Sequence, residues 1–192
     1  MTDIDVKSLK RIMRNNIQNL TFTALMAAVL CVIGPIVIPI GMVPVSFANM
    51  AIYLTIILLG KKRSIISVAL YLLIGFVGLP VFAGFSGGAG KLLGPTGGYL
   101  IGYLVLSLIG CSLLEKGKKQ GKQKIWYQIF ALGVGNLGLY FVGTAWLMYQ
   151  SKLNLMSALS VGVIPFLFFD VIKILLAISI GNSIKRRMTF LF

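Results

Sequence analysis

The fold is decided by a stretch near the C-terminus, IPFLFFDVIKILLA (residues 164–177), which suits a lipid bilayer but contains an acid and a base. Asp170 and Lys173 are three residues apart, so on a helix they point from the same face. A charge at the centre of a membrane costs about 2.5–3.5 kcal/mol. The pair is therefore either a salt bridge between helices, which is often no more stabilising than an apolar pair, or a polar anchor for a ligand with donors and acceptors.

The composition predicts an all-α integral membrane protein that forms one domain over residues 1–192. The chain is 58% hydrophobic and 11% charged, whereas soluble domains are about half apolar and about a quarter charged. Cys31 and Cys111 lack the spacing of a metal or redox site, and histidine is absent. Because histidine is the commonest general base and metal ligand, we expect neither an enzyme nor a metal or cofactor site.

Six apolar runs predict six transmembrane helices. They are separated by basic segments or by segments rich in glycine and proline. Residues 1–16 are polar and basic and suit an amphipathic helix on the cytoplasmic membrane surface. The predicted spans are residues 19–33, 46–59, 64–78, 99–114, 126–149 and 156–180.

The basic residues predict the orientation of these spans. Fifteen of the eighteen Lys and Arg residues lie in the N-terminus, the loop at 60–63, the loop at 115–124 and the C-terminus. Lys91 and Lys152 alone lie in the alternate loops. Cytoplasmic loops are enriched in Lys and Arg, so both termini are expected in the cytoplasm. Orientation also explains the net charge of +14 without a nucleic-acid partner.

Two irregular segments are then predicted to face outward and to cover a ligand, one between Pro39 and Pro44 and one between Pro80 and Gly94. Irregular backbone near a membrane is tolerated where it packs against protein or lines a cavity. A phosphate loop is excluded, because it needs Gly six residues before its Lys and Ser or Thr after it. Phe85 and Leu92 occupy these positions around Lys91, so the chain is expected to have no ATPase of its own.

Ala24 and Ala28 form an A-x-x-x-A pattern in the first predicted span. Small residues four apart make a helix face that another helix can approach closely. This face would suit close packing against another helix. Alanine is a common residue, however, so the pattern also arises by chance.

Four motifs stand out in the chain, namely VPV (43–45), GLPVFAG (78–84), GPTGGY (94–99) and Pro165 followed by Asp170-x-x-Lys173. As a set, they resemble the BioY family, the biotin-binding substrate components (S components) of energy-coupling factor (ECF) transporters. The resemblance covers about residues 20–185. It implies an S-component fold of six helices that captures biotin from outside, and a partner made of a membrane coupling protein with two ATPases. It also implies that Ala24 and Ala28 meet the coupling protein.

The sequence departs from the family at Ser46-Phe47-Ala48, where members often carry Thr-Leu-Gln. The nearest amide side chain here is Asn49. We expect Asp170 to accept from the ureido N–H of biotin and Lys173 to donate to its carbonyl or tail, because buried N–H groups need acceptors. The other expected substrate-binding residues are Val45, Ser46, Phe47, Asn49, Tyr71, Phe82, Gly84, Phe85, Ser86, Gly88, Trp146 and Tyr149.

The resulting hypothesis is a high-affinity biotin-binding subunit of an ATP-driven vitamin uptake transporter in the bacterial cell membrane. The alternative is a stand-alone channel or secondary carrier for a small anionic solute. A single intramembrane ion pair and the lack of an evident inverted repeat weigh against a secondary carrier. An intramembrane enzyme is disfavoured because no nucleophile and base are paired in the sequence.

Overall fold

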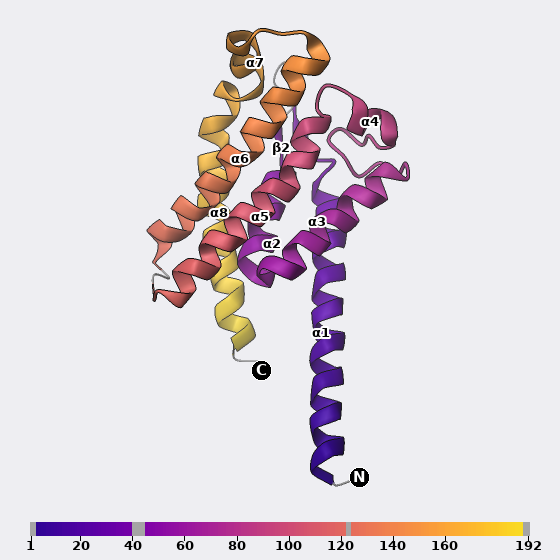
Figure 1. Ribbon diagram of the computed structural model, residues 1–192, viewed down its shortest axis with the longest axis vertical. Coiled ribbons are helices and arrows are strands. Elements are labelled where there is room, and N and C mark those ends of the chain that lie inside the picture. The colour runs from indigo at the N-terminus through magenta and orange to yellow at the C-terminus, as the bar shows by residue number, and fades with distance from the viewer. Residues whose placement is uncertain (1–2, 40–44, 122–123, 190–192) are drawn as a thin grey trace.

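The computed structural model describes residues 3–39, 45–121 and 124–189, and the chain there is almost entirely helical (Figure 1). Two short antiparallel strands, β1 (Val37–Ile38) and β2 (Val45–Ser46), pair Val37 with Ser46 and Ile38 with Val45. The helices are α1 (Asp3–Ile33), α2 (Ala48–Leu59), α3 (Lys61–Phe76), α4 (Ala89–Leu93), α5 (Gly97–Lys119), α6 (Ile125–Ser151), α7 (Leu155–Gly162) and α8 (Ile164–Thr189).

Four segments of the described chain are long and apolar enough to cross a bilayer, namely residues 16–33, 97–119, 125–151 and 155–187. The chain is thus a multi-pass membrane protein. The apolar helix α2 has only 12 residues, about 18 Å at about 1.5 Å per residue, and α3 has 16. Because both fall short of the roughly 30 Å hydrocarbon core, the count of six spans stays a prediction.

The basic character of the N-terminal segment predicted a separate helix on the membrane surface. The described part of the chain shows no such separate helix. Helix α1 runs without a break from Asp3 to Ile33 and projects beyond the rest of the molecule (Figure 1). No glycine or proline occurs within it, so nothing in the sequence ends the helix near residue 16. The polar N-terminal segment and the first apolar span therefore belong to one continuous helix.

The predicted last span, residues 156–180, is divided in the structure. Helix α7 ends at Gly162 and α8 begins at Ile164, with Val163 between them at φ −130° and ψ −57°. Pro165 is the second residue of α8, where its missing N–H costs no helical hydrogen bond. In an unbroken helix Pro165 could not donate to the carbonyl of Val161 and its ring would clash with that carbonyl, which explains why the helix breaks just before it.

Helices α5 and α6 form the most extensive helix–helix contact of the described chain. Glycines on both helices make this possible, since small residues let two backbones approach closely. A Cβ at Gly102 would press on Leu139, and one at Gly135 would press on Leu106. Of the other helices, α8 packs against α2 and α6, and α3 packs against α1 and α5.

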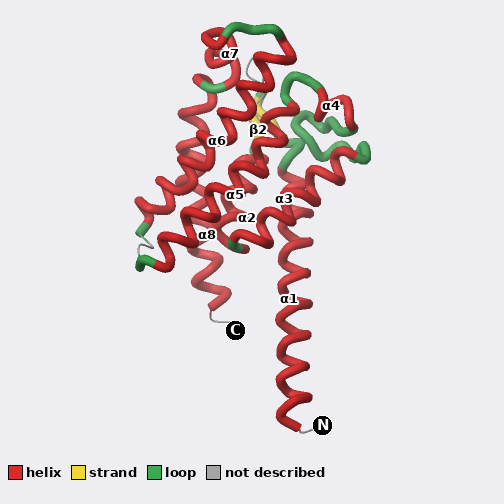
Figure 2. Tube along the Cα trace, in the orientation of Figure 1, coloured by secondary structure: helices red, strands yellow, loops and turns green. Residues whose placement is uncertain are grey.

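The segment between α3 and α5 is irregular apart from α4, and it lies toward the α7 end of the molecule (Figure 2). It is anchored by Phe82, which is fully buried and meets the ring of Tyr71 edge to face at 5.5 Å. The backbone N–H of Phe82 donates to the carbonyl of Ser86 at 2.8 Å. The other predicted covering segment, Pro39–Pro44, lies largely outside the described residues.

Replacing Gly75 with Ala is expected to lower the melting temperature, because a Cβ there would overlap the Phe82 ring. Overpacking of a core costs about 1–3 kcal/mol. The matched control is Gly133→Ala in α6, where a Cβ would meet nothing within 4 Å and alanine favours the helix. Thermal unfolding in detergent should separate the two variants, and equal melting temperatures would contradict this packing of Phe82.

Candidate functional site

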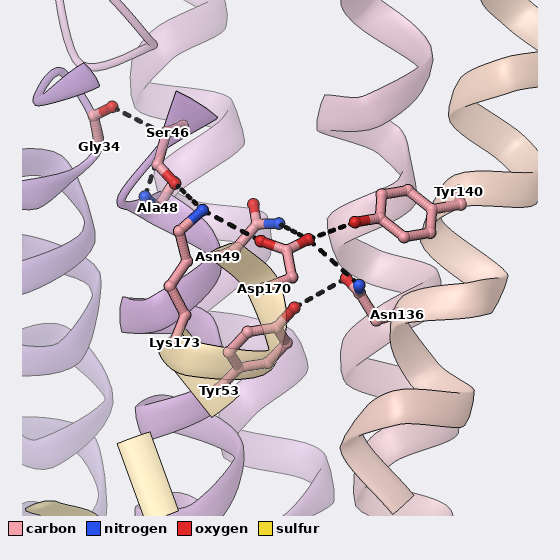
Figure 3. A network of polar contacts seen from close by, with 9 residues as sticks. All are labelled: Gly34, Ser46, Ala48, Asn49, Tyr53, Asn136, Tyr140, Asp170 and Lys173. Carbon is pink, nitrogen blue, oxygen red and sulfur yellow. Dashed lines mark hydrogen bonds and ion pairs between the residues drawn. The ribbon is translucent and has the colours of Figure 1, made fainter. Parts of the chain in front are cut away.

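Asp170 and Lys173 lie on one face of α8, as their spacing predicts, and both are buried, at 2% and 5% exposed. Lys173 Nζ is 3.0 Å from Asp170 Oδ1. Figure 3 shows the pair between α2 and α6, within a network of polar side chains. Two charges removed from water in this way are stable only if further hydrogen bonds satisfy them.

The carboxylate of Asp170 receives these bonds at its second oxygen, Oδ2. Tyr140 Oη donates to it at 2.6 Å, Asn136 Nδ2 at 3.1 Å and Asn49 Nδ2 at 3.4 Å. Tyr53 Oη in turn donates to Asn136 Oδ1 at 2.7 Å, which fixes the orientation of that amide. Donors from α2 and α6 therefore converge on the acid of α8 and hold its side chain in place.

Lys173 connects α8 to the strand pair. Its Nζ donates to the backbone carbonyl of Ser46 at 2.9 Å, as well as to Asp170. The Ser46 hydroxyl accepts from the N–H of Ala48 at 3.0 Å and donates to the carbonyl of Gly34 at 3.3 Å. Ser46 therefore contributes its main chain to the site, while its side chain shapes the turn into α2.

A cavity of about 50 Å³ opens beside the ion pair. One rim is closed where the Tyr99 hydroxyl donates to the carbonyl of Gly162 at 3.1 Å, joining α5 to the end of α7. Tyr99 fits there because residue 162 is glycine. A Cβ at this position would overlap the Tyr99 hydroxyl. The lining residues are Ser46, Asn49, Tyr99, Tyr103, Leu139, Tyr140, Gly162, Phe166, Asp170 and Lys173.

Four of the expected substrate-binding residues thus meet at one cavity, namely Asp170, Lys173, Ser46 and Asn49. Val45 is buried in the core one residue before Ser46, and Phe47 is half-buried at the start of α2. Asn49 contributes an amide to the site although the sequence departs from the family pattern just before it.

The expected aromatic walls lie elsewhere in this structure. Tyr71 and Phe82 fill the core between α3 and the following segment, because the small Gly75 leaves room for the Phe82 ring. Trp146 Nε1 donates to the carbonyl of Gly94 at 2.9 Å and so fastens the segment before α5. Tyr149 is 81% exposed, one turn beyond Trp146.

The remaining expected residues shape the loop between α3 and α4 rather than the cavity. Gly84 and Phe85 have positive φ values of 71° and 55°, and Phe85 is 71% exposed. The Ser86 hydroxyl donates to the carbonyl of Ala83 at 2.8 Å. The N–H of Gly88 donates to the carbonyl of Gly75 at 2.7 Å. In the arrangement seen here, this loop does not reach the ion pair.

The ion pair retains hydrogen-bonding capacity toward the cavity. Among the described residues, Lys173 alone donates to Asp170 Oδ1, although a carboxylate oxygen can accept two bonds. The Lys173 ammonium uses two of its three donors, on Asp170 and Ser46. A spare acceptor and a spare donor thus lie about one hydrogen-bond length apart, which suits a ligand that presents an N–H beside a C=O.

Three residues of the network were not predicted from the sequence, namely Tyr53, Asn136 and Tyr140. A signal for them exists, because Asn49 and Tyr53 are four residues apart in α2, and Asn136 and Tyr140 are four apart in α6. Polar residues at this spacing within apolar helices share one face. In a membrane such a face turns toward the protein interior.

Comparison with known proteins agrees with this architecture. The profile of the BioY family matches residues 6–190. A biotin transporter BioY from Thermotoga maritima is 38% identical over 91% of this chain and 97% of its own length. Biotin transporter BioY2 from Lactococcus lactis is 36% identical over 89% of this chain and 92% of its own length.

A solved structure has the same fold. It is the crystal structure of the S-component for biotin from an ECF-type ABC transporter, and it superposes with a TM-score of 0.83 at 32% identity, covering 97% of this chain and 95% of that one. These relatives are transport proteins, which confirms the expectation that the chain is not an enzyme. The apolar helices and the buried ion pair agree with these matches. The chain belongs to the BioY family.

Proposed function

We propose that the chain binds biotin from outside the cell as the substrate-binding subunit of an ATP-driven ECF transporter in the bacterial cell membrane. Its partners in this proposal are biotin, a membrane coupling protein and two ATPase subunits. Residues 1–192 act as one membrane domain with six spans and both termini in the cytoplasm, as the distribution of Lys and Arg favours.

The observation that carries this proposal is the buried Asp170–Lys173 pair with its spare acceptor and donor at the cavity. Biotin has a ureido ring with N–H donors beside a carbonyl acceptor, and these groups complement Asp170 Oδ1 and Lys173 Nζ. Charge-assisted hydrogen bonds of this kind are the stronger ones. They also form in a site from which water is largely excluded, where a polar group left unpaired is costly.

The cavity must widen to admit the ligand. Its volume of about 50 Å³ is far below the roughly 300 Å³ or more of a typical small-molecule site. The contact between Tyr99 and Gly162 closes one rim, and the break between α7 and α8 lies next to it. We infer that biotin entry separates α7 from α5 by breaking the contact between Tyr99 and Gly162.

The direct test is titration of the purified chain with biotin in detergent. We expect saturable binding of one biotin per chain. An analogue methylated at both ureido nitrogens should bind at least about tenfold more weakly, because a hydrogen bond to a charged group contributes about 1.5–3 kcal/mol. Absence of biotin binding by the folded chain would contradict the proposal, as would equal affinity for the analogue.

A second measurement separates this function from that of a stand-alone carrier. The chain alone in liposomes should not accumulate biotin against a gradient when ATP is supplied, because no nucleotide-binding motif is present. Addition of the coupling protein and both ATPases should restore ATP-dependent accumulation. Accumulation driven only by an ion gradient, without these partners, would identify a secondary carrier instead.

A further inference from the structure

A second and larger cavity, of about 770 Å³, lies at the end of the bundle opposite α7. It is formed where α2, α5 and α8 end and where α3 and α6 begin. Its volume falls within the roughly 300–1,000 Å³ range of small-molecule sites. The ion-pair cavity shares none of its lining residues, so it is a separate site.

The wall of this cavity is apolar where it enters the bundle. Ile56, Ile57 and Leu59 from α2 are buried there. Tyr127 packs its ring on Gly117 and donates its hydroxyl to the carbonyl of Leu113 at 3.0 Å. The phenol group is thereby held against α5, where it lines the cavity.

The rim is strongly basic. Five cations line it, and Glu115 is the single acid among the lining residues. Glu115 is already engaged, because its Oε1 accepts the backbone N–H of Lys61 at 3.2 Å. The lining cations are Lys61, Lys62, Arg63, Lys118 and Lys185.

The chain has few acidic side chains to balance its many cations. It contains only four acidic residues against eighteen Lys and Arg. Asp170 is bound within the other site, and Asp3 and Asp5 lie at the far end of α1 (Figure 1). Like charges that share a cavity repel one another, so an external anion would stabilise this end of the bundle.

We propose that this cavity binds the headgroup of an anionic phospholipid from the adjacent leaflet. A basic rim above an apolar wall, at the ends of transmembrane helices, matches an anionic headgroup with acyl chains below it. A soluble anion would use the rim but not the wall formed by α2. An acidic protein segment would also suit the rim, and the test below distinguishes these ligands.

The test is native mass spectrometry of the full-length chain in detergent, titrated with dioleoyl phosphatidylglycerol or dioleoyl phosphatidylcholine. We expect one phosphatidylglycerol to bind in preference to phosphatidylcholine. The variant Lys61→Gln/Lys118→Gln should weaken phosphatidylglycerol binding roughly 20-fold, because each cation near an anionic headgroup accounts for roughly a fivefold change in affinity.

The matched control is Lys116→Gln/Lys119→Gln. It also removes two positive charges, both from α5, but neither residue lines the cavity. It should bind phosphatidylglycerol like the unmodified chain. If both variants lose binding equally, the effect is general surface charge and the proposal fails. Circular dichroism verifies folding, and the single variants Lys118→Gln and Lys119→Gln repeat the comparison if a double variant misfolds.

Two competition measurements identify the ligand class. Displacement of the lipid by inorganic phosphate at equal concentration would reveal a site for a free anion and overturn the lipid assignment. Displacement by a poly-glutamate peptide at a lower concentration than the lipid would assign the cavity to a protein partner instead. Retention of phosphatidylglycerol in both competitions is the result that the proposal predicts.

Discussion

Replacing Asp170 with Asn is expected to weaken biotin binding at least roughly 30-fold, since loss of one partner of a buried charged pair costs about 2–5 kcal/mol. The amide has one oxygen and one N–H₂ group, so it cannot accept from Lys173, Tyr140 and Asn136 and also from the ligand. It also leaves the Lys173 ammonium, which is 5% exposed, without its counter-charge.

Lys173→Ala is expected to have a similar effect, because it removes the spare donor and leaves the Asp170 carboxylate uncompensated. Isothermal titration of the purified variants with biotin measures both losses. The matched control is Asn182→Ala on the same helix, which removes a hydrogen bond of 3.1 Å to Gln128 far from the ion pair. That variant should lose stability but keep its affinity for biotin.

A double variant distinguishes ligand binding from a purely structural salt bridge. Replacing Asp170 and Lys173 together with Leu and Met removes both buried charges, and such replacements are often neutral or stabilising. We expect the double variant to recover much of the melting temperature that each single variant loses while biotin binding stays absent. If the single variants fold and bind biotin like the unmodified chain, the pair is a structural bridge and the proposed site is wrong.

The sequence located the ion pair because an acid within an apolar run is rare and costly. It did not locate Asn136 or Tyr140, although both donate to Asp170. A single neutral polar residue in a membrane helix costs much less than a charge. Which way it faces is decided by how α6 packs on its neighbours, and its packing on α5 depends on glycines spread along both helices.

Aromatic side chains were the least predictable part of the site. Phe82 and Tyr149 both suit a ligand wall by residue type, yet one is fully buried in the core and the other is 81% exposed. Residue type alone does not fix the face that a side chain occupies in an irregular segment or at a helix end. By contrast, the cavity is lined by Tyr99 and Tyr103, four residues apart in α5, which helical spacing alone places together.

Replacing both Ala24 and Ala28 with Trp is expected to abolish most biotin uptake by the assembled transporter while leaving biotin binding intact. Helix α1 packs against α2 and α3 with its opposite side, and both alanines are exposed. They are surrounded by exposed apolar side chains, which gives this face the character of a surface for another helix. The neighbouring exposed residues are Ile17, Leu20, Leu25 and Val32.

Two large side chains would separate backbones that must approach closely. Steric overpacking costs about 1–3 kcal/mol at each position, so the pair should lower assembly with the coupling protein roughly 30-fold or more. The control is Ala145→Trp, an exposed alanine on α6. Co-purification with the coupling protein measures assembly, and titration with biotin measures binding. Equal loss of binding and assembly would mean that Ala24 and Ala28 belong to the folded core of the subunit and not to a docking face.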